Sequence, residues 1–131
     1  MQNRNSLRVF VVDDEKVIAQ SLAVLLRQSG FLAESFINPL EALTEAASTP
    51  PDLLISDVMM PEMSGVELAI KLRAFHPDCK ILLFSGQAAT ADLLRAAREQ
   101  GHDFELLLKP VHPADLLAAI KRVVPPENAE E

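Results

Sequence analysis

Acidic, hydroxyl and lysine side chains directly follow four short apolar runs of this chain. The sites are Asp13 and Asp14 after residues 9–12, Asp57 after residues 53–56, Ser85 after residues 81–84, and Lys109 after residues 106–108. If these runs are parallel strands, their carboxyl ends meet at one edge of the sheet, where open α/β folds bind ligands. Three carboxylates at one edge repel one another and require a cation, and oxygen ligands of this kind suit Mg²⁺.

The same edge offers the groups needed for phosphoryl transfer. Lys109 would add a positive charge opposite the carboxylates, and a transferring phosphoryl group needs such charges beside its oxygens. Asp57 is the best candidate for the nucleophile, because it stands alone while Asp13 and Asp14 form a metal-holding pair. Ser85 could donate a hydrogen bond to the bound phosphoryl group. Each residue alone is explained equally well as part of a turn or cap, so the interpretation depends on their convergence.

The elements that must position these residues follow from the apolar pattern. The four runs are continuous, which is typical of strands buried on both faces of a parallel sheet, and residues 32–36 form a more polar run that suits an edge strand. Five helices are predicted between and after the runs: over residues 18–26 with Gly30 as a stop, from Pro39, from Gly65, over residues 90–100, and from Pro113. This alternation indicates an α/β fold, an open parallel sheet with helices on both faces.

Composition limits the possible classes of protein. A chain of 131 residues suits one domain, and 12 Lys and Arg against 19 Asp and Glu give a net charge of −7. Such an acidic chain is a poor nucleic-acid binder. The single Cys79 excludes an internal disulfide and a cysteine-clustered zinc site, and we expect it to be a small buried residue. Without a signal sequence or a long apolar run, we expect a soluble cytoplasmic protein with no membrane association.

Four segments together resemble the receiver domain of bacterial two-component response regulators. They are Val11 to Glu15, Leu54 to Gly65, Leu83 to Gly86, and Leu107 to Pro110. The resemblance covers residues 7–124, leaving residues 1–6 as an N-terminal extension and residues 125–131 as an acidic tail that we expect to be disordered. It implies a flavodoxin-like sheet with strand order 2-1-3-4-5, which the spacing of the runs cannot supply by itself.

The resemblance also implies a role for each residue of the site. Asp57 would be phosphorylated by a histidine kinase, a phosphotransfer protein or a small phosphodonor, and Lys109 and Ser85 would contact the phosphoryl group. The ligands of Mg²⁺ would be Asp14, Asp57 and the backbone carbonyl of Met59, with Asp13 acting through water. Receiver domains also usually have a cis peptide bond at the position of Lys109-Pro110, although few X–Pro bonds are cis.

This chain departs from the family pattern at one position of the expected conformational switch. Receivers commonly have Tyr or Phe three residues before the lysine, where this chain has Leu106. Phe104 lies two residues earlier, so it would face the same side of the strand. The aromatic switch is therefore in question, while the phosphorylation chemistry is not. Met59 and Gln87 occupy positions that tune the lifetime of the phosphoryl group, with a net effect that has no predicted sign.

The first functional hypothesis is a stand-alone phosphoacceptor of a two-component phosphorelay. Phosphorylation would change how a downstream protein binds the face made by the fourth helix, the fifth strand and the fifth helix. The chain would be a monomer or weak homodimer, and it would catalyse only its own Mg²⁺-dependent phosphorylation and dephosphorylation. Met1 and the short acidic tail favour a complete chain over a fragment of a larger regulator.

Two further hypotheses remain. One is an adaptor that keeps the receiver fold and works without phosphorylation, which Leu106 favours and the intact acidic residues oppose. The other is a Mg²⁺ phosphatase of the haloacid dehalogenase type. Such enzymes have a second Asp two residues after the nucleophile, where this chain has Met59.

Overall fold

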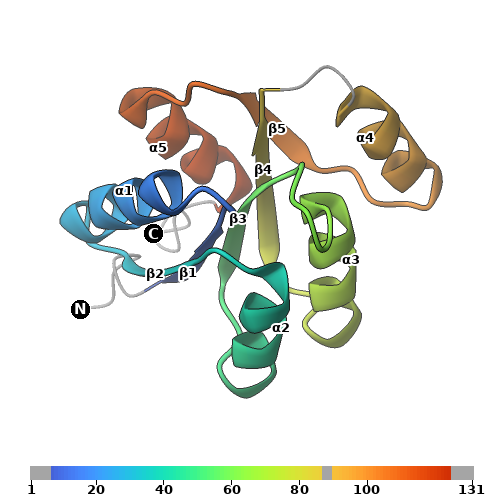
Figure 1. Cartoon of the computed structure of the whole chain (residues 1–131), viewed down its shortest axis with the longest axis horizontal. Helices are drawn as coiled ribbons and strands as arrows, with labels where there is room; N and C mark the ends of the chain where they lie inside the picture. The colour runs from blue at the N-terminus through green and yellow to red at the C-terminus, as the bar shows by residue number, and fades with distance from the viewer. Residues whose placement is uncertain (1–6, 87–89, 125–131) are drawn as a thin grey trace, which may run out of the picture.

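Strands and helices alternate along the computed structural model, which describes residues 7–86 and 90–124 (Figure 1). The predicted extension, the predicted acidic tail and Gln87 lie outside the described residues. The strands are β1 (Arg8–Val12), β2 (Leu32–Phe36), β3 (Leu53–Asp57), β4 (Lys80–Ser85) and β5 (Glu105–Leu108). The helices are α1 (Lys16–Gln28), α2 (Pro39–Ser48), α3 (Gly65–Phe75), α4 (Thr90–Glu99) and α5 (Pro113–Val123).

The five strands form one parallel sheet in the order β2-β1-β3-β4-β5. The predicted fold class and strand order are therefore confirmed, and the polar run at residues 32–36 is an edge strand as expected. The strands pair with Val12 beside Ser56, Asp57 beside Phe84, and Ser85 beside Leu108. This register brings the carboxyl ends of β1, β3, β4 and β5 to the same edge of the sheet.

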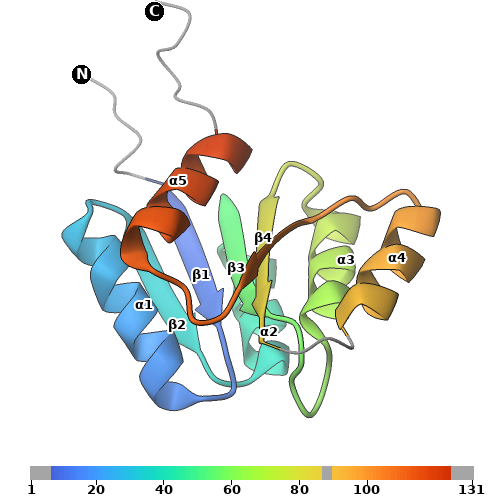
Figure 2. The same cartoon turned by 90° about the horizontal axis from the view of Figure 1, so that it is seen from above.

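Two apolar cores lie on the two faces of the sheet, because successive strand residues point to opposite sides. Helices α1 and α5 cover one face, whereas α2 and α3 cover the other and α4 lies beyond α3 (Figures 1 and 2). The α1/α5 core contains Val9, Val11, Ile55, Leu82, Phe84, Ala23, Leu116 and Ile120. The α2/α3/α4 core contains Phe10, Val12, Leu54, Leu83, Ala42, Leu72, Leu94 and Phe104.

Helix boundaries follow the predicted local signals. The Asn38 side chain caps α2 by accepting a hydrogen bond from the N–H of Leu40, and Ser64 caps α3 by accepting from the N–H of Glu67. Gly30 follows α1 with φ +99°, a conformation that favours glycine after a helix end. Among the described residues, no helix is long and apolar enough to cross a membrane.

Cys79 is buried immediately before β4, as predicted for a small apolar residue. Its thiol lies 3.4 Å from the carbonyl oxygen of Lys80. Burial raises the pKa of the Cys79 thiol to about 12, so little thiolate forms at neutral pH.

Candidate functional site

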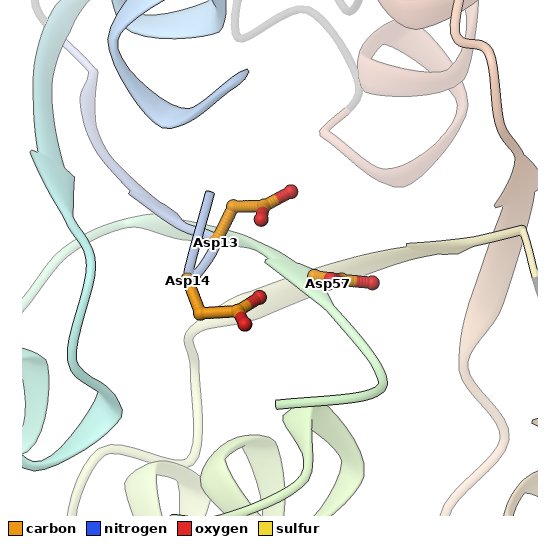
Figure 3. A group of neighbouring side chains, drawn as sticks. All are labelled: Asp13, Asp14 and Asp57. Carbon is orange, nitrogen blue, oxygen red and sulfur yellow. The ribbon is translucent and has the colours of Figure 1, made fainter. Parts of the chain in front are cut away.

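Three carboxylates meet at the carboxyl edge of the sheet (Figure 3). Asp13 and Asp14 leave the chain just after β1, Asp57 ends β3, and the Asp14 carboxylate points toward Asp57. One carboxylate oxygen from each residue lies within 4.8 Å of the other two. Asp13 is fully buried and Asp57 is 6% exposed, whereas Asp14 is open to solvent. The cluster therefore has one open side, through which a ligand can reach it.

Asp13 is held in place where the chain turns from β1 into α1. Its Oδ1 atom accepts a hydrogen bond of 2.8 Å from the N–H of Glu15, and its own N–H donates to the carbonyl of Phe36. Its Oδ2 atom accepts from Nζ of Lys109 at 3.2 Å. These contacts satisfy a charge that is otherwise costly to bury.

Lys109 lies between two of the carboxylates. Its Nζ atom is 3.2 Å from Oδ2 of Asp13 and 3.4 Å from Oδ2 of Asp57. Its backbone N–H donates to the carbonyl of Ser85 at 3.0 Å, which continues the pairing of β4 with β5. The following peptide bond, to Pro110, is cis as the resemblance implied. Burial lowers the pKa of Lys109, but attraction by Asp13 and Asp57 outweighs it and the net shift is upward.

Burial shifts the pKa of Asp57 upward, in the opposite direction from its effect on the pKa of Lys109. The pKa of Asp57 is raised above 3.8, first by burial and then by the neighbouring charge of Asp13, while Lys109 partly offsets both. One lysine therefore does not neutralise three carboxylates. The donor set consists of hard oxygens with one exposed side, and this suits a divalent cation such as Mg²⁺.

The chain after Asp57 is packed closely against the start of α3. The N–H of Gly65 donates to the carbonyl of Val58 at 2.8 Å, and a Cβ atom at Gly65 would lie only 2.2 Å from the carbonyl oxygen of Asp57. The buried Ser56 hydroxyl donates to the same oxygen at 2.9 Å. Glycine is therefore required here by close approach of the backbone, and its sequence motif marked the position.

Ser85 and Met59, the other two predicted site residues, lie at the same edge. Ser85 ends β4 and is fully buried, and Met59 lies partly buried two residues beyond Asp57. Alternation along β4 places the Ser85 side chain on the α3/α4 side of the sheet, with Leu83, whereas Asp57 lies on the α1/α5 side. Ser85 therefore lies at the boundary between the acidic cluster and the face of the sheet on which α3 and α4 lie.

Leu106 packs where an aromatic ring was expected from the resemblance. It is partly buried against the α2/α3/α4 core, to which the buried Phe104 also belongs. The two residues share one side of the strand, as predicted. The Arg73 guanidinium lies 5.5 Å from the centre of the Phe104 ring, and the His102 ring stacks on the same residue. The contact with Arg73 therefore holds Phe104 against α3. Phe104 lies just before the start of β5, whereas Lys109 follows its other end.

Comparison with known proteins decides the family. Residues 9–121 match the family model for the response regulator receiver domain. The chain belongs to this family. The transcriptional regulatory protein PrrA of Mycobacterium leprae is 37% identical over 120 residues, which cover 92% of this chain and 51% of PrrA. The response regulator receiver protein CpdR of Brucella abortus is 32% identical over 117 residues, which cover 89% of this chain and 96% of CpdR.

Solved receiver structures share the architecture. The chemotaxis protein CheY4 of Vibrio cholerae superimposes with a TM-score of 0.81 at 29% identity, covering 91% of this chain and 99% of that one. This receiver domain spans about half the length of the curated relatives CreB, PrrA and MprA that it matches. The two called transcriptional regulatory proteins, CreB and PrrA, therefore contain a further part that this chain does not match.

Two residues that contact the site were not predicted from the sequence. Ser56 bonds to the carbonyl of Asp57, and the ring of Phe84 lies beneath the Lys109 ammonium. In the sequence both are ordinary residues of apolar runs. Only the strand register shows that Phe84 lies beside Asp57.

Proposed function

We propose that this receiver domain is a phosphoacceptor of a two-component phosphorelay, with Asp57 as the residue that takes the phosphoryl group. One observation carries the proposal: the Asp57 carboxylate lies within 4.8 Å of two other carboxylates and 3.4 Å from the Lys109 ammonium. A carboxylate that only capped a turn would not need this arrangement. The partner that donates the phosphoryl group is a histidine kinase, a phosphotransfer protein or a small acyl phosphate.

The chemistry is a single displacement at phosphorus. An Asp57 carboxylate oxygen forms the new P–O bond while the bond from phosphorus to the donor's nitrogen or oxygen breaks, and the donor leaves with that electron pair. Lys109 is placed to face the phosphoryl oxygens because its ammonium already contacts Asp57. Ser85 would donate a hydrogen bond to the phosphoryl group after its side chain moves. The proposal places this reaction in the cytoplasm.

The residues of the cluster fit a magnesium site. Asp14, Asp57 and the backbone carbonyl of Met59 would hold the ion directly. Asp13 would act through water, because its Oδ1 atom already accepts from the N–H of Glu15 and its Oδ2 atom from Lys109. Bound Mg²⁺ would offset the repulsion among the carboxylates and attract the oxygens of the incoming phosphoryl group. The raised pKa of Asp57 supports the need for this positive charge.

Intact mass measurement after incubation with acetyl phosphate and Mg²⁺ tests the proposal. We expect the wild type to gain one phosphoryl group, and Asp57→Asn or added EDTA to abolish the gain. Asp78→Asn is a matched control, because Asp78 is exposed and precedes β4 at the opposite edge of the sheet. Lack of any gain from acetyl phosphate and from a phosphorylated histidine kinase or phosphotransfer protein would exclude the phosphoacceptor.

A downstream protein would read the phosphorylated state at the face made by α4, β5 and α5. This face carries a hollow of about 310 Å³ between β5 and α5, and Leu108 beside it is 71% exposed. Ser85 and Leu106 lie on the same side of the sheet, so movement of Ser85 would alter packing beneath α4. We expect the receiver to act as a monomer or weak homodimer, and with its net charge of −7 to bind protein rather than nucleic acid.

A phosphorylation-independent adaptor is the second candidate, and Leu106 favours it because the family's switch residue is aromatic. The two candidates differ in how phosphorylation affects partner binding. If the phosphorylated wild type and Asp57→Asn bind the partner with equal affinity, the adaptor is correct. A difference of tenfold corresponds to about 1.4 kcal/mol and would establish a switch.

A further inference from the structure

Phe84 is a buried aromatic residue beside the nucleophile candidate. It is 2% exposed and pairs with Asp57 across β3 and β4, so the two side chains leave the sheet on the same face. Its ring belongs to the α1/α5 core together with Ile55 and Leu82. The ring therefore ends this core just where the acidic cluster begins.

The Lys109 side chain crosses this ring on its way to the carboxylates. Its stem passes close to Gly86, where an added Cβ atom would lie 3.5 Å from Cβ of Lys109. Its Nζ atom then lies over the Phe84 ring, 5.2 Å from the centre. This distance is within the range of about 6 Å in which the negative face of an aromatic ring attracts a cation.

We propose that Phe84 is a positioning residue that holds the Lys109 ammonium beside Asp57 through the face of its ring. The inference rests on the proposed phosphoacceptor function and adds a residue that acts on the reaction through Lys109. Two carboxylates compete for the ammonium, since Nζ lies 3.2 Å from Asp13 and 3.4 Å from Asp57. The ring supplies a third attraction, and this keeps the charge between the two carboxylates and within reach of the phosphoryl oxygens.

An aliphatic side chain at position 84 would fill space but would not attract the cation. The Lys109 side chain is 23% exposed, so without the ring it has room to move toward solvent or toward Asp13. The expected consequence is slower phosphoryl uptake by about threefold to tenfold, the range that a partly desolvated cation–π contact supports. Affinity for Mg²⁺ should change less than twofold, because the position-84 variants keep every proposed ligand of the ion and also keep the charge of Lys109.

Two changes at position 84 separate the ring's charge distribution from its shape. Phe84→Leu removes the ring, and Phe84→3,4,5-trifluorophenylalanine keeps the ring but weakens the negative potential of its face. Phe10 supplies the matched control, because it is fully buried in the opposite core and packs on Phe36 with ring centres 4.7 Å apart. The same two changes at Phe10 should affect stability without slowing uptake.

The experiment measures the rate of phosphoryl uptake from acetyl phosphate at saturating Mg²⁺, with Mg²⁺ affinity determined by NMR titration for each protein. Slower uptake with unchanged Mg²⁺ affinity in both position-84 variants, but not in the Phe10 variants, supports the inference. Equal rates for the trifluorinated and wild-type proteins, or parallel loss of rate and Mg²⁺ affinity, would overturn it. If the wild type takes up no phosphoryl group from acetyl phosphate or from a phosphorylated histidine kinase or phosphotransfer protein, the proposed function fails and the inference fails with it.

Discussion

Replacing Asp57 by Asn should make the folded protein more stable at neutral pH in the absence of Mg²⁺. The reason is that the native state buries the Asp57 carboxyl group beside two other carboxylates. Burial and the Asp13 charge raise the pKa of Asp57 above its ordinary value of 3.8. A raised carboxyl pKa means that folding favours the protonated, neutral form. The amide of Asn is neutral at every pH and has nearly the same shape.

The magnitude follows from the charges around Asp57. At an effective dielectric constant of about 20, the Lys109 ammonium at 3.4 Å attracts it by about 5 kcal/mol. Each carboxylate, at 4.8 Å or less, repels it by about 3.5 kcal/mol before solvent screening, which weakens this repulsion most for the exposed Asp14. Attraction and repulsion nearly cancel, so the cost of burial decides the sign. We expect Asp57→Asn to gain about 1–2 kcal/mol, an increase in Tm of about 3–8 °C.

Thermal unfolding followed by circular dichroism in EDTA measures this difference as a function of pH. In the wild type, the contribution of protonated Asp57 to the free energy of unfolding is fully present below pH 3.8. It is lost as the pH rises through the raised pKa that Asp57 has in the folded state. The advantage of the variant should therefore be largest at neutral pH and shrink on acidification. Asp78→Asn, at an exposed position, should show no such trend. A variant that is no more stable than the wild type at neutral pH, or an advantage independent of pH, would refute the reasoning.

Three further changes test other parts of the site. Lys109→Ala removes the cation between two carboxylates, so we expect a loss of about 2 kcal/mol in urea unfolding and tighter Mg²⁺ binding by NMR titration. Gly65→Ala places a Cβ atom 2.2 Å from the carbonyl oxygen of Asp57, and should cost about 2–3 kcal/mol and slow phosphoryl uptake. Gly86→Ala is its control, since the nearest atom there is 3.5 Å away and stability should hardly change. Cys79, buried with a pKa of about 12, should react with a thiol reagent in the folded protein far more slowly than after denaturation.

The sequence alone was enough to predict the fold class and the residues that meet at the site. Continuous apolar runs indicate strands of a parallel sheet, and parallel strands bring their carboxyl ends to one edge. The residue after each run could therefore be assigned to that edge without a model of the packing. Asp13, Asp57 and Lys109 do come into contact there. Caps at Asn38 and Ser64 were predictable for a similar reason, because a helix end depends on a few adjacent residues.

The tertiary structure decided what depends on residues distant in the chain. The strand order followed from the family resemblance and not from spacing, because several orders are compatible with the same run of elements. Only the strand register shows that Phe84 lies beside Asp57. Only the packing explains why position 65 requires glycine, because a Cβ atom there would meet the carbonyl oxygen of Asp57. Strand register and the close approach of backbone segments arise from how strands and helices pack together, so no local pattern of residues predicts them.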